Sequence, residues 1–247
     1  MIELHHGEPD ADTLKLLIAL HELGLPFTSR YVDTAKLEQW SAAHRRLAPQ
    51  GQVPVLVDAG EIMNEGAFAL QYLAEAYGAR RLAPRAARLW YEVQAWNARV
   101  DAALGPAVSL LGWTRATSAA ERAAYRTALA EVSGRERPAG WFAVLADAEA
   151  SEDQRANARE RIGEMLAEIE RALDGAAWLV GGDYSIADIN AFAYLHTLPR
   201  LLPERCHAGA TPRVLDWLAR SGARPAVRSA LATRRAPADR DAYAPPG

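Results

Sequence analysis

The spacing of apolar residues changes character near residue 80. Before that point, short apolar stretches are interleaved with stretches of helical period, which predicts strands and helices in alternation. Gly24 closes the first helical stretch as a C-cap glycine does. The expected strands cover 2–4, 27–32, 53–57 and 61–63, and the expected helices cover 13–23, 37–47 and 68–77. This β-α-β-α-β-β-α order predicts an α/β unit in which helices pack on a four-stranded mixed sheet.

From about residue 85 onward the strand patterns stop and only helical ones continue. Ser185 with Asp188, and Ser118 with Glu121, form capping patterns at the starts of two expected helices. The expected helices cover 85–111, 118–132, 152–173, 185–196, 211–219 and 224–232. We therefore expect two domains, 1–80 and 85–233, the second all-helical. The tail over 234–247 is too polar and proline-rich to build a core, so we expect it to be disordered.

Composition excludes several classes of protein. The chain has 28 basic and 31 acidic residues, a net charge of −3, without the basic excess of a nucleic-acid binder. Its single cysteine, Cys206, allows neither an internal disulfide nor a cysteine-based zinc site. No apolar run approaches the roughly 18 residues of a membrane helix, and residues 1–5 lack a secretory pattern. We expect a cytoplasmic protein with no nucleic-acid or membrane partner.

The charge is divided unequally along the chain. Residues 1–80 carry 6 basic and 11 acidic side chains, whereas residues 81–247 carry 22 and 20. The first segment is therefore net acidic by 5 and the second net basic by 2. This change coincides with the change in apolar pattern and supports the interpretation as two domains.

Three motifs, taken in order, point to one family. They are PQGQVPVL at 49–56, NEGAFALQYL at 64–73 and SIADI at 185–189. Each motif is weak alone, but their order and spacing together are specific. Over nearly its whole length the chain resembles the glutathione transferase superfamily. The resemblance implies a thioredoxin-like N-terminal domain, an all-α C-terminal helical bundle, and glutathione as co-substrate.

Val53 and Pro54 have a physical role in such a site. With a cis peptide between them, Val53 offers its N–H and C=O sideways to an extended peptide, which pairs like an added strand. In the family this element binds the cysteinyl part of glutathione, and the preceding Gln52 is expected to bond the glycyl carboxylate. The ordinary alternatives are a proline entering an edge strand and a solvated loop glutamine.

Glu65 and Gly66 open the helix expected at 68–77. The Glu65 carboxylate and the helix N-terminal amides together offer the acceptor and donors that the γ-glutamyl head needs. The alternative is that Glu65 only complements the helix dipole. The family normally has Ser or Thr after this Glu, so Gly66 removes one hydroxyl donor.

A narrower resemblance is to the bacterial β-etherases of lignin breakdown. It is carried by LKLLIAL at 14–20, VDTAKLEQ at 32–39, GQVP at 51–54 and GWTR at 112–115, and by the long stretch between Arg115 and Glu160. This resemblance implies that the glutathione thiolate attacks the carbon bearing an aryl ether next to a ketone. A phenol leaves, and a glutathione thioether remains.

The nucleophile in that reaction is the substrate thiol, whose thiolate needs a donor at the N-terminus of the first helix. The β-etherase pattern has Asn-Ser there, and this chain has Asp12 and Thr13. Thr13 still offers an O–H group. The Asp12 carboxylate would raise the pKa of a nearby thiol, which disfavours the thiolate. We expect Asp12 to serve mainly as the N-cap of the helix.

The aromatic substrate requires an apolar pocket between the domains. The candidates for its walls are Trp113, Trp141 and Phe142, with Arg115 available for a phenolate or carbonyl oxygen. His6 follows the first strand and is a further candidate for substrate contact. Each also has an ordinary alternative, because tryptophans at helical spacing usually belong to a core and helix arginines are usually solvated. No histidine spacing supports a metal site.

Three functions remain in competition. The leading one is a glutathione-dependent β-etherase that works as a dimer, pairing the N-terminal domain of one chain with the helical domain of the other. Because Asp12 and Gly66 both depart from the motif, the second is a structural subunit in a heterodimer with a competent relative. The third is a general detoxifying glutathione transferase with aromatic substrates.

Overall fold

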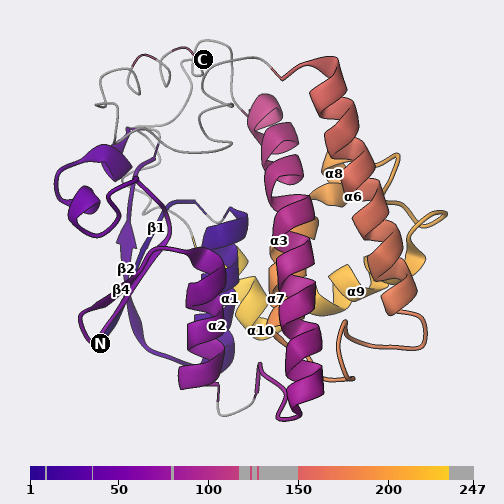
Figure 1. Ribbon diagram of the computed structural model, residues 1–247, viewed down its shortest axis with the longest axis horizontal. Coiled ribbons are helices and arrows are strands. Elements are labelled where there is room, and N and C mark those ends of the chain that lie inside the picture. The colour runs from indigo at the N-terminus through magenta and orange to yellow at the C-terminus, as the bar shows by residue number, and fades with distance from the viewer. Residues whose placement is uncertain are drawn as a thin grey trace.

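The computed structural model describes residues 1–8, 10–34, 36–78, 81–116, 123, 127 and 150–233. A small sheet lies on one side of the molecule and helices make up the other (Figure 1). The strands are β1 (Ile2–His6), β2 (Phe27–Tyr31), β3 (Val55–Asp58) and β4 (Glu61–Met63).

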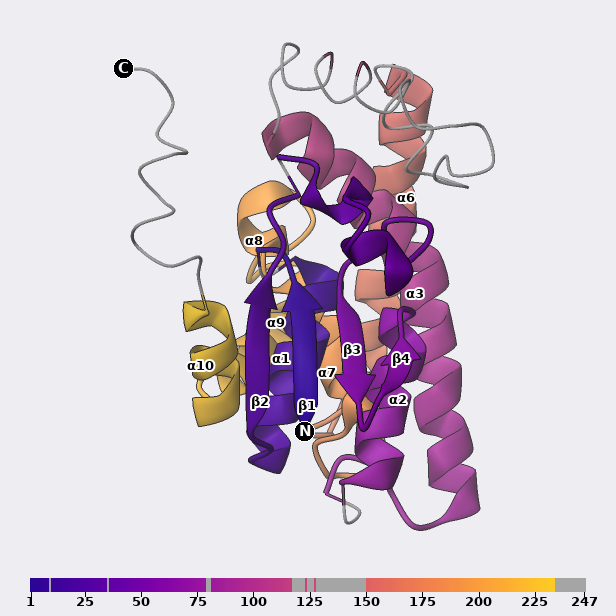
Figure 2. The same ribbon diagram turned by 90° about the vertical axis from the view of Figure 1, so that its left-hand side faces the viewer.

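The sheet has the order β2-β1-β3-β4. β1 is parallel to β2 and antiparallel to β3, and β3 and β4 form an antiparallel hairpin. The crossover from β1 to β2 is α1 (Ala11–Leu23), and α2 (Gly66–Ala76) follows β4. Figure 2 shows the sheet face-on with both helices behind it. The predicted four-stranded mixed sheet is therefore confirmed.

The helix expected at 37–47 is wrong. The segment instead forms two short 3-10 turns, η1 (Glu38–Trp40) and η2 (His44–Arg46). Leu37 has a φ of 61°, in the left-handed region, and Ser41 is extended. Both conformations interrupt the right-handed turn that an α-helix requires.

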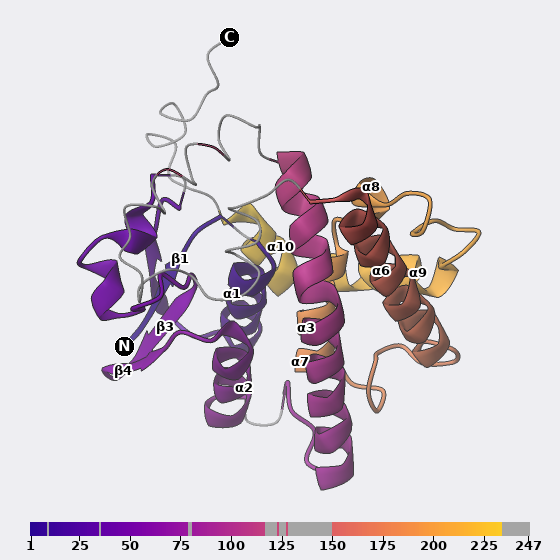
Figure 3. The same cartoon turned by 45° about the horizontal axis from the view of Figure 1, so that its top comes forward.

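The helical part begins with α3 (Ala87–Ala116), which lies beside α6 (Glu152–Ala172) (Figure 3). After α6 the described residues form α7 (Ile186–Leu195), α8 (Leu198–Leu201), α9 (Pro212–Gly222) and α10 (Pro225–Ala232). α7 packs against both α1 and α3, so it joins the sheet side to the bundle. The helix expected at 118–132, apart from residues 123 and 127, and the tail at 234–247 lie outside the described residues.

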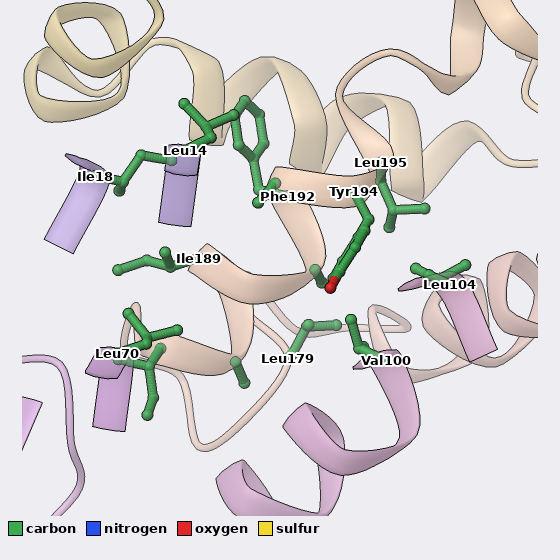
Figure 4. Packing of buried hydrophobic residues seen from close by; sticks show 14 of the residues in the cluster. Leu14, Ile18, Leu70, Val100, Leu104, Leu179, Ile189, Phe192, Tyr194 and Leu195 are labelled. Atoms are coloured by element: carbon green, nitrogen blue, oxygen red, sulfur yellow. The ribbon is translucent and has the colours of Figure 1, made fainter. Parts of the chain in front are cut away.

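α1 is the centre of the core. Every side chain from Thr13 to Leu20 is buried, because α2, α7 and α10 pack on the helix and the sheet lies against it. Figure 4 shows Leu14 of α1 and Leu70 of α2 facing Ile189 and Phe192 of α7. Because it is enclosed on all sides, the sequence of this helix is apolar along nearly its whole length.

The capping pattern predicted at 185–188 is confirmed. Ser185 and Asp188 form a reciprocal capping box at the N-terminus of α7. The Asp188 carboxylate is fully buried and also accepts hydrogen bonds from the Leu179 backbone N–H and the Trp217 indole, each at 3.0 Å. Burial raises the pKa of Asp188 to about 6, although the hydrogen-bond donors around the carboxylate lower it.

Candidate functional site

Four segments meet beside one end of the sheet: the residue after β1, the start of α1, the loop before β3 and the start of α2. A Cβ built on Gly7 would lie 3.8 Å from Val53 Cγ1, and one built on Gly66 would lie 3.4 Å from Asp12 Oδ1. We call these four residues, Gly7, Asp12, Val53 and Gly66, the rim. The sheet pairs His5 with Val55 and Leu56 with Met63, so both pairs lie at the same end of the sheet.

The N-cap of α1 is Asp10, so the prediction that Asp12 caps this helix is wrong. The Asp10 side chain accepts the Thr13 backbone N–H at 2.8 Å, and its backbone is extended, as a cap requires. Asp12 lies within the first turn. Its carboxylate is 51% exposed and therefore available for another role.

Thr13 is fully buried in the first turn of α1. Its hydroxyl oxygen has no hydrogen-bond partner among the residues that the structure describes. The hydroxyl nevertheless lies close enough to the Asp10 carboxylate to lower the pKa of that group, and it can turn to donate to a ligand instead.

Lys15 is a candidate for the site that no sequence motif predicts. Its side chain is 1% exposed, and its Nζ lies 2.8 Å from Asp12 Oδ1 and 3.3 Å from Asp101 Oδ1. Nζ also lies 3.4 Å from the Tyr194 hydroxyl, and Asn190 donates to Asp101 at 3.1 Å. This network joins α1, α3 and α7. The one signal in the sequence is a lysine inside an otherwise apolar helical run.

Lys15 stays charged despite its position. Burial lowers the pKa of its ammonium, but attraction to Asp12, Tyr194 and Asp101 together raises it above the ordinary lysine value. A buried ammonium with two carboxylates keeps its proton, because losing it would leave both carboxylates unbalanced.

The loop before β3 carries the predicted Val53-Pro54 turn, and that peptide bond is cis. Gln52 is held through its backbone, whose carbonyl accepts from His44 Nε2 at 2.8 Å. Gly51 has a φ of +70°, and a Cβ there would lie 3.0 Å from the Trp40 ring. The Gln52 side-chain oxygen and the Trp40 indole nitrogen are buried without a partner within the described parts of the chain.

The N-terminus of α2 has no side-chain cap. Glu65 occupies the N-cap position with an extended backbone and an exposed side chain, and it makes no capping hydrogen bond. The first intrahelical bond runs from the Ala69 N–H to the Glu65 carbonyl. The N–H groups of Gly66, Ala67 and Phe68 therefore have no intrahelical acceptor and form an anion-binding end.

His6 is not placed to contact a substrate directly. Its ring is 2% exposed, with Nδ1 at 2.7 Å from the Gly7 carbonyl and Nε2 at 2.7 Å from the Ser29 hydroxyl. The carbonyl fixes a proton on Nδ1, so Nε2 accepts from Ser29. Burial lowers the pKa of His6. The ring supports the backbone that leads into the rim.

The other predicted substrate contacts are not tested by the geometry. Trp113 and Arg115 belong to α3, but their side chains lie outside the described part of the structure. Trp141 and Phe142 lie outside the described residues entirely. Cys206 is buried between α8 and α9, and burial raises the pKa of its thiol, so it remains without a catalytic assignment.

The described residues hold no group of three or more His, Cys, Asp or Glu side chains able to bind a metal ion. Among the helices in these parts of the chain, none has the length and apolar character needed to cross a membrane.

Two family models match the sequence. The glutathione S-transferase N-terminal domain matches residues 13–76, and the glutathione S-transferase C-terminal domain matches residues 136–225. Together the two segments cover more than half of the chain. They lie in the order that the three motifs predict.

Individual relatives give the same result. Protein LigF of Sphingobium sp. (strain NBRC 103272 / SYK-6) is 28% identical over 92% of this chain and 91% of its own length. The glutathione S-transferase-like protein OpS6 of Beauveria bassiana is 26% identical over 95% of this chain and 96% of its own.

Solved structures share the fold. The crystal structure of the Sphingobium β-etherase LigF has a TM-score of 0.82 at 27% identity and covers 93% of this chain and 98% of its own. A theta class glutathione S-transferase from Xanthomonas axonopodis pv. citri, crystallised with glutathione bound, has a TM-score of 0.72 at 23% identity, with 94% and 98% covered.

Proposed function

Because the chain belongs to the glutathione S-transferase superfamily, we propose that it binds glutathione at the rim and transfers its sulfur to an aryl ether substrate. The carrying observation is that the end of β1, the start of β3 and the end of β4, which leads into α2, lie at one end of the sheet, beside N–H groups of α2 that have no intrahelical acceptor. The uncapped start of α2 offers N–H groups, and Thr13 offers a buried hydroxyl.

Each part of glutathione has a candidate partner. Val53 pairs with the cysteinyl backbone as an added strand does, and the Gln52 side chain bonds the glycyl carboxylate. Glu65 and the first-turn amides of α2, beginning at Gly66, take the γ-glutamyl head. Only the amide NH2 group of Gln52 can donate to that carboxylate, because its side-chain oxygen is an acceptor.

Thr13 is the proposed donor to the thiolate. A hydroxyl at the start of α1 stabilises the anion by a hydrogen bond and the helix dipole. Asp12 opposes this, since a nearby carboxylate raises the pKa of a thiol. The ion pair with Lys15 at 2.8 Å reduces that opposition by neutralising part of the Asp12 charge.

The proposed reaction is a displacement. The thiolate sulfur forms a bond to the carbon next to a ketone, and the bond from that carbon to the aryl ether oxygen breaks. The leaving phenolate takes up the proton that the thiol gave, so the products are a phenol and a glutathione thioether. Trp113, Arg115, Trp141 and Phe142 remain the candidates for the substrate pocket. The similarity to LigF over most of both chains favours this substrate class.

A dimer is part of the proposal. Phe68 on α2 and Tyr91 on α3 are 71% and 72% exposed, and Ile62 on β4 is 45% exposed. α2 and α3 lie side by side (Figures 1 and 3). Large apolar side chains exposed on neighbouring elements are typical of a protein–protein interface. The partner is a second copy of this chain or a related glutathione transferase.

Two measurements test the proposal. Calorimetric titration of glutathione into the full chain should show binding in the micromolar-to-millimolar range. Turnover should then release guaiacol from a β-guaiacyl ether of an aryl ketone, and Thr13→Val should lower kcat at least tenfold while glutathione still binds.

The competing functions give different results. A folded chain without detectable glutathione binding would favour the structural subunit that Asp12 and Gly66 suggest. Glutathione binding with turnover of 1-chloro-2,4-dinitrobenzene, but none of the aryl ether, would favour the general detoxifying enzyme.

A further inference from the structure

The buried ammonium group of Lys15 connects α1 with the helical part of the chain. Its side chain is 1% exposed, and Nζ lies 2.8 Å from Asp12 Oδ1 on α1 and 3.3 Å from Asp101 Oδ1 on α3. One positive charge therefore serves two carboxylates on different helices. Whatever part of this charge Asp101 balances is not available to Asp12.

The two carboxylates have different surroundings. Asp101 also accepts from the Asn190 amide at 3.1 Å and from the Tyr194 hydroxyl at 3.2 Å, so it has two further donors on α7. Asp12 is 51% exposed, and Lys15 is its ion-pair partner among the described residues. Without Lys15, Asp101 would keep two hydrogen bonds, whereas the Asp12 carboxylate would act unopposed beside Thr13.

The charge of Lys15 reaches the end of α1 at which the thiol is proposed to bind. Burial and the Asp12 carboxylate raise the pKa of Asp10, the N-cap residue, to about 6, and Lys15 is among the groups that lower it. Because Lys15 is shielded from solvent, salt screens its charge less than that of a surface lysine. Asp12 and Lys15 therefore act on this end of the helix with opposite signs.

We propose that the helical part of the chain tunes the glutathione thiol through Lys15. Asp101 competes with Asp12 for the ammonium group, so it determines how much of the Asp12 charge remains uncompensated beside the sulfur. The inference rests on the proposed function and deepens it, because Lys15 and Asp101 are positioning residues that act through Asp12. It also accounts for an acidic residue at position 12 of a site that must form a thiolate.

Ultraviolet difference titration of glutathione bound to the full chain tests this. The thiolate has an absorption band that the thiol lacks, and S-methylglutathione, which has no thiol, supplies the blank. Lys15→Met should raise the pKa of the bound thiol by about one unit, because the Asp12 carboxylate then acts unopposed. Asp101→Asn should lower this pKa by about half a unit, because the whole ammonium charge then serves Asp12. Two substitutions that merely loosen the fold would not give shifts of opposite sign.

Two further variants assign the effect to the shared ammonium. In the Lys15→Met background, Asp101→Asn should shift the thiol pKa by less than half of its effect alone, because Asp101 acts through Lys15. Glu92→Gln removes another acid of α3, one paired with Arg88, and should leave the thiol pKa unchanged. Thermal melting by circular dichroism shows whether each variant is folded. If Lys15→Met is not, Asp101→Asn, which keeps the shape of the side chain, decides alone.

An unchanged or raised thiol pKa in Asp101→Asn overturns the inference. A lower melting temperature or a lower glutathione affinity without a shift of the thiol pKa overturns it as well, since a purely structural role gives that pattern. In both cases the wild-type chain still binds glutathione, so the proposed function stands. If the wild-type chain binds no glutathione, the proposed function itself fails and this inference fails with it.

Discussion

Replacing Asp188 by Asn tests whether a single buried carboxylate secures α7, the helix that joins the sheet side to the bundle. Two donors reach each of its oxygens: the Leu179 N–H and the Trp217 indole reach Oδ1, and the Ser185 N–H and hydroxyl reach Oδ2. Asparagine keeps one oxygen and turns an NH2 group toward the remaining donors. The substitution preserves shape and removes charge and acceptor capacity.

The expected cost follows from these contacts. One buried backbone N–H, that of Ser185, loses its acceptor, which costs about 1–3 kcal/mol. The two bonds kept on the oxygen lose their charge assistance, about 1 kcal/mol each. The Ser185 hydroxyl can rotate to accept from the new amide, so it adds little. The neutral amide also removes the cost of burying a charge, the same cost that raises the Asp188 pKa, so the free energy of unfolding should fall by about 1–3 kcal/mol.

Urea unfolding at pH 7.5 measures this loss. The pKa of Asp188 is about 6, so the wild-type carboxylate is ionised at that pH. Far-UV circular dichroism and tryptophan fluorescence should both report the loss, because Trp217 is one of the donors. Asp183→Asn is the control: its exposed side chain lies five positions earlier, and it should stay within about 0.5 kcal/mol. A loss under about 1 kcal/mol in Asp188→Asn would refute the reasoning.

Three further predictions concern the surroundings of the rim and the proposed interface. Burial lowers the pKa of His6 below 6.5, so as the pH decreases the unfolded chain takes up this proton before the folded chain does. The free energy of unfolding should therefore fall as the pH decreases below about 6.5. Urea unfolding at pH 7.5 and pH 5.5 should show a smaller fall in His6→Gln than in the wild type. Gly51→Ala should lower the free energy of unfolding by about 1–2 kcal/mol and weaken glutathione binding, because a Cβ at a φ of +70° would meet the Trp40 ring at 3.0 Å. Gly24→Ala is the control, since Gly24 has a φ of +64° but open space around it. It should show only the cost of the backbone conformation and no change in glutathione binding. Phe68→Glu should shift the chain to a monomer in sedimentation velocity, because it places a charge on the exposed apolar surface of α2; an unchanged sedimentation coefficient would place the interface elsewhere.

Much of the fold follows from local sequence signals. Period and capping residues predict α1, the hairpin of β3 and β4, and the Ser185 box, because these features depend on neighbours within a few positions. The helix predicted at 37–47 does not form, because here the conformation is not decided by neighbouring residues. Its apolar spacing fits a helix weakly, whereas the left-handed Leu37 is set by the path that the chain must take between β2 and β3.

The site is harder to predict for a physical reason. Asp10 and Asp12 are equally good caps by residue type, and only the extended backbone of Asp10 decides between them. Lys15 finds its partners at Asp101 and Tyr194, on two other helices, so no local pattern reveals them. The resemblance to a known family predicts the motif residues. It does not predict that Asp12 and Gly66 lie next to each other, because they belong to different helices.

The packing of α10 on α1 has a consequence for how the protein is made in the cell. α10, the last helix among the described residues, covers part of α1, and Arg224 at the start of α10 bonds Glu22 at 2.9 Å. Roughly 200 residues separate them, which takes a ribosome about 10–40 seconds to translate. Throughout that interval one apolar flank of α1 lacks its cover. We therefore expect the nascent chain to expose an apolar helix surface until α10 is made, and a chain truncated before residue 225 to accumulate as aggregate.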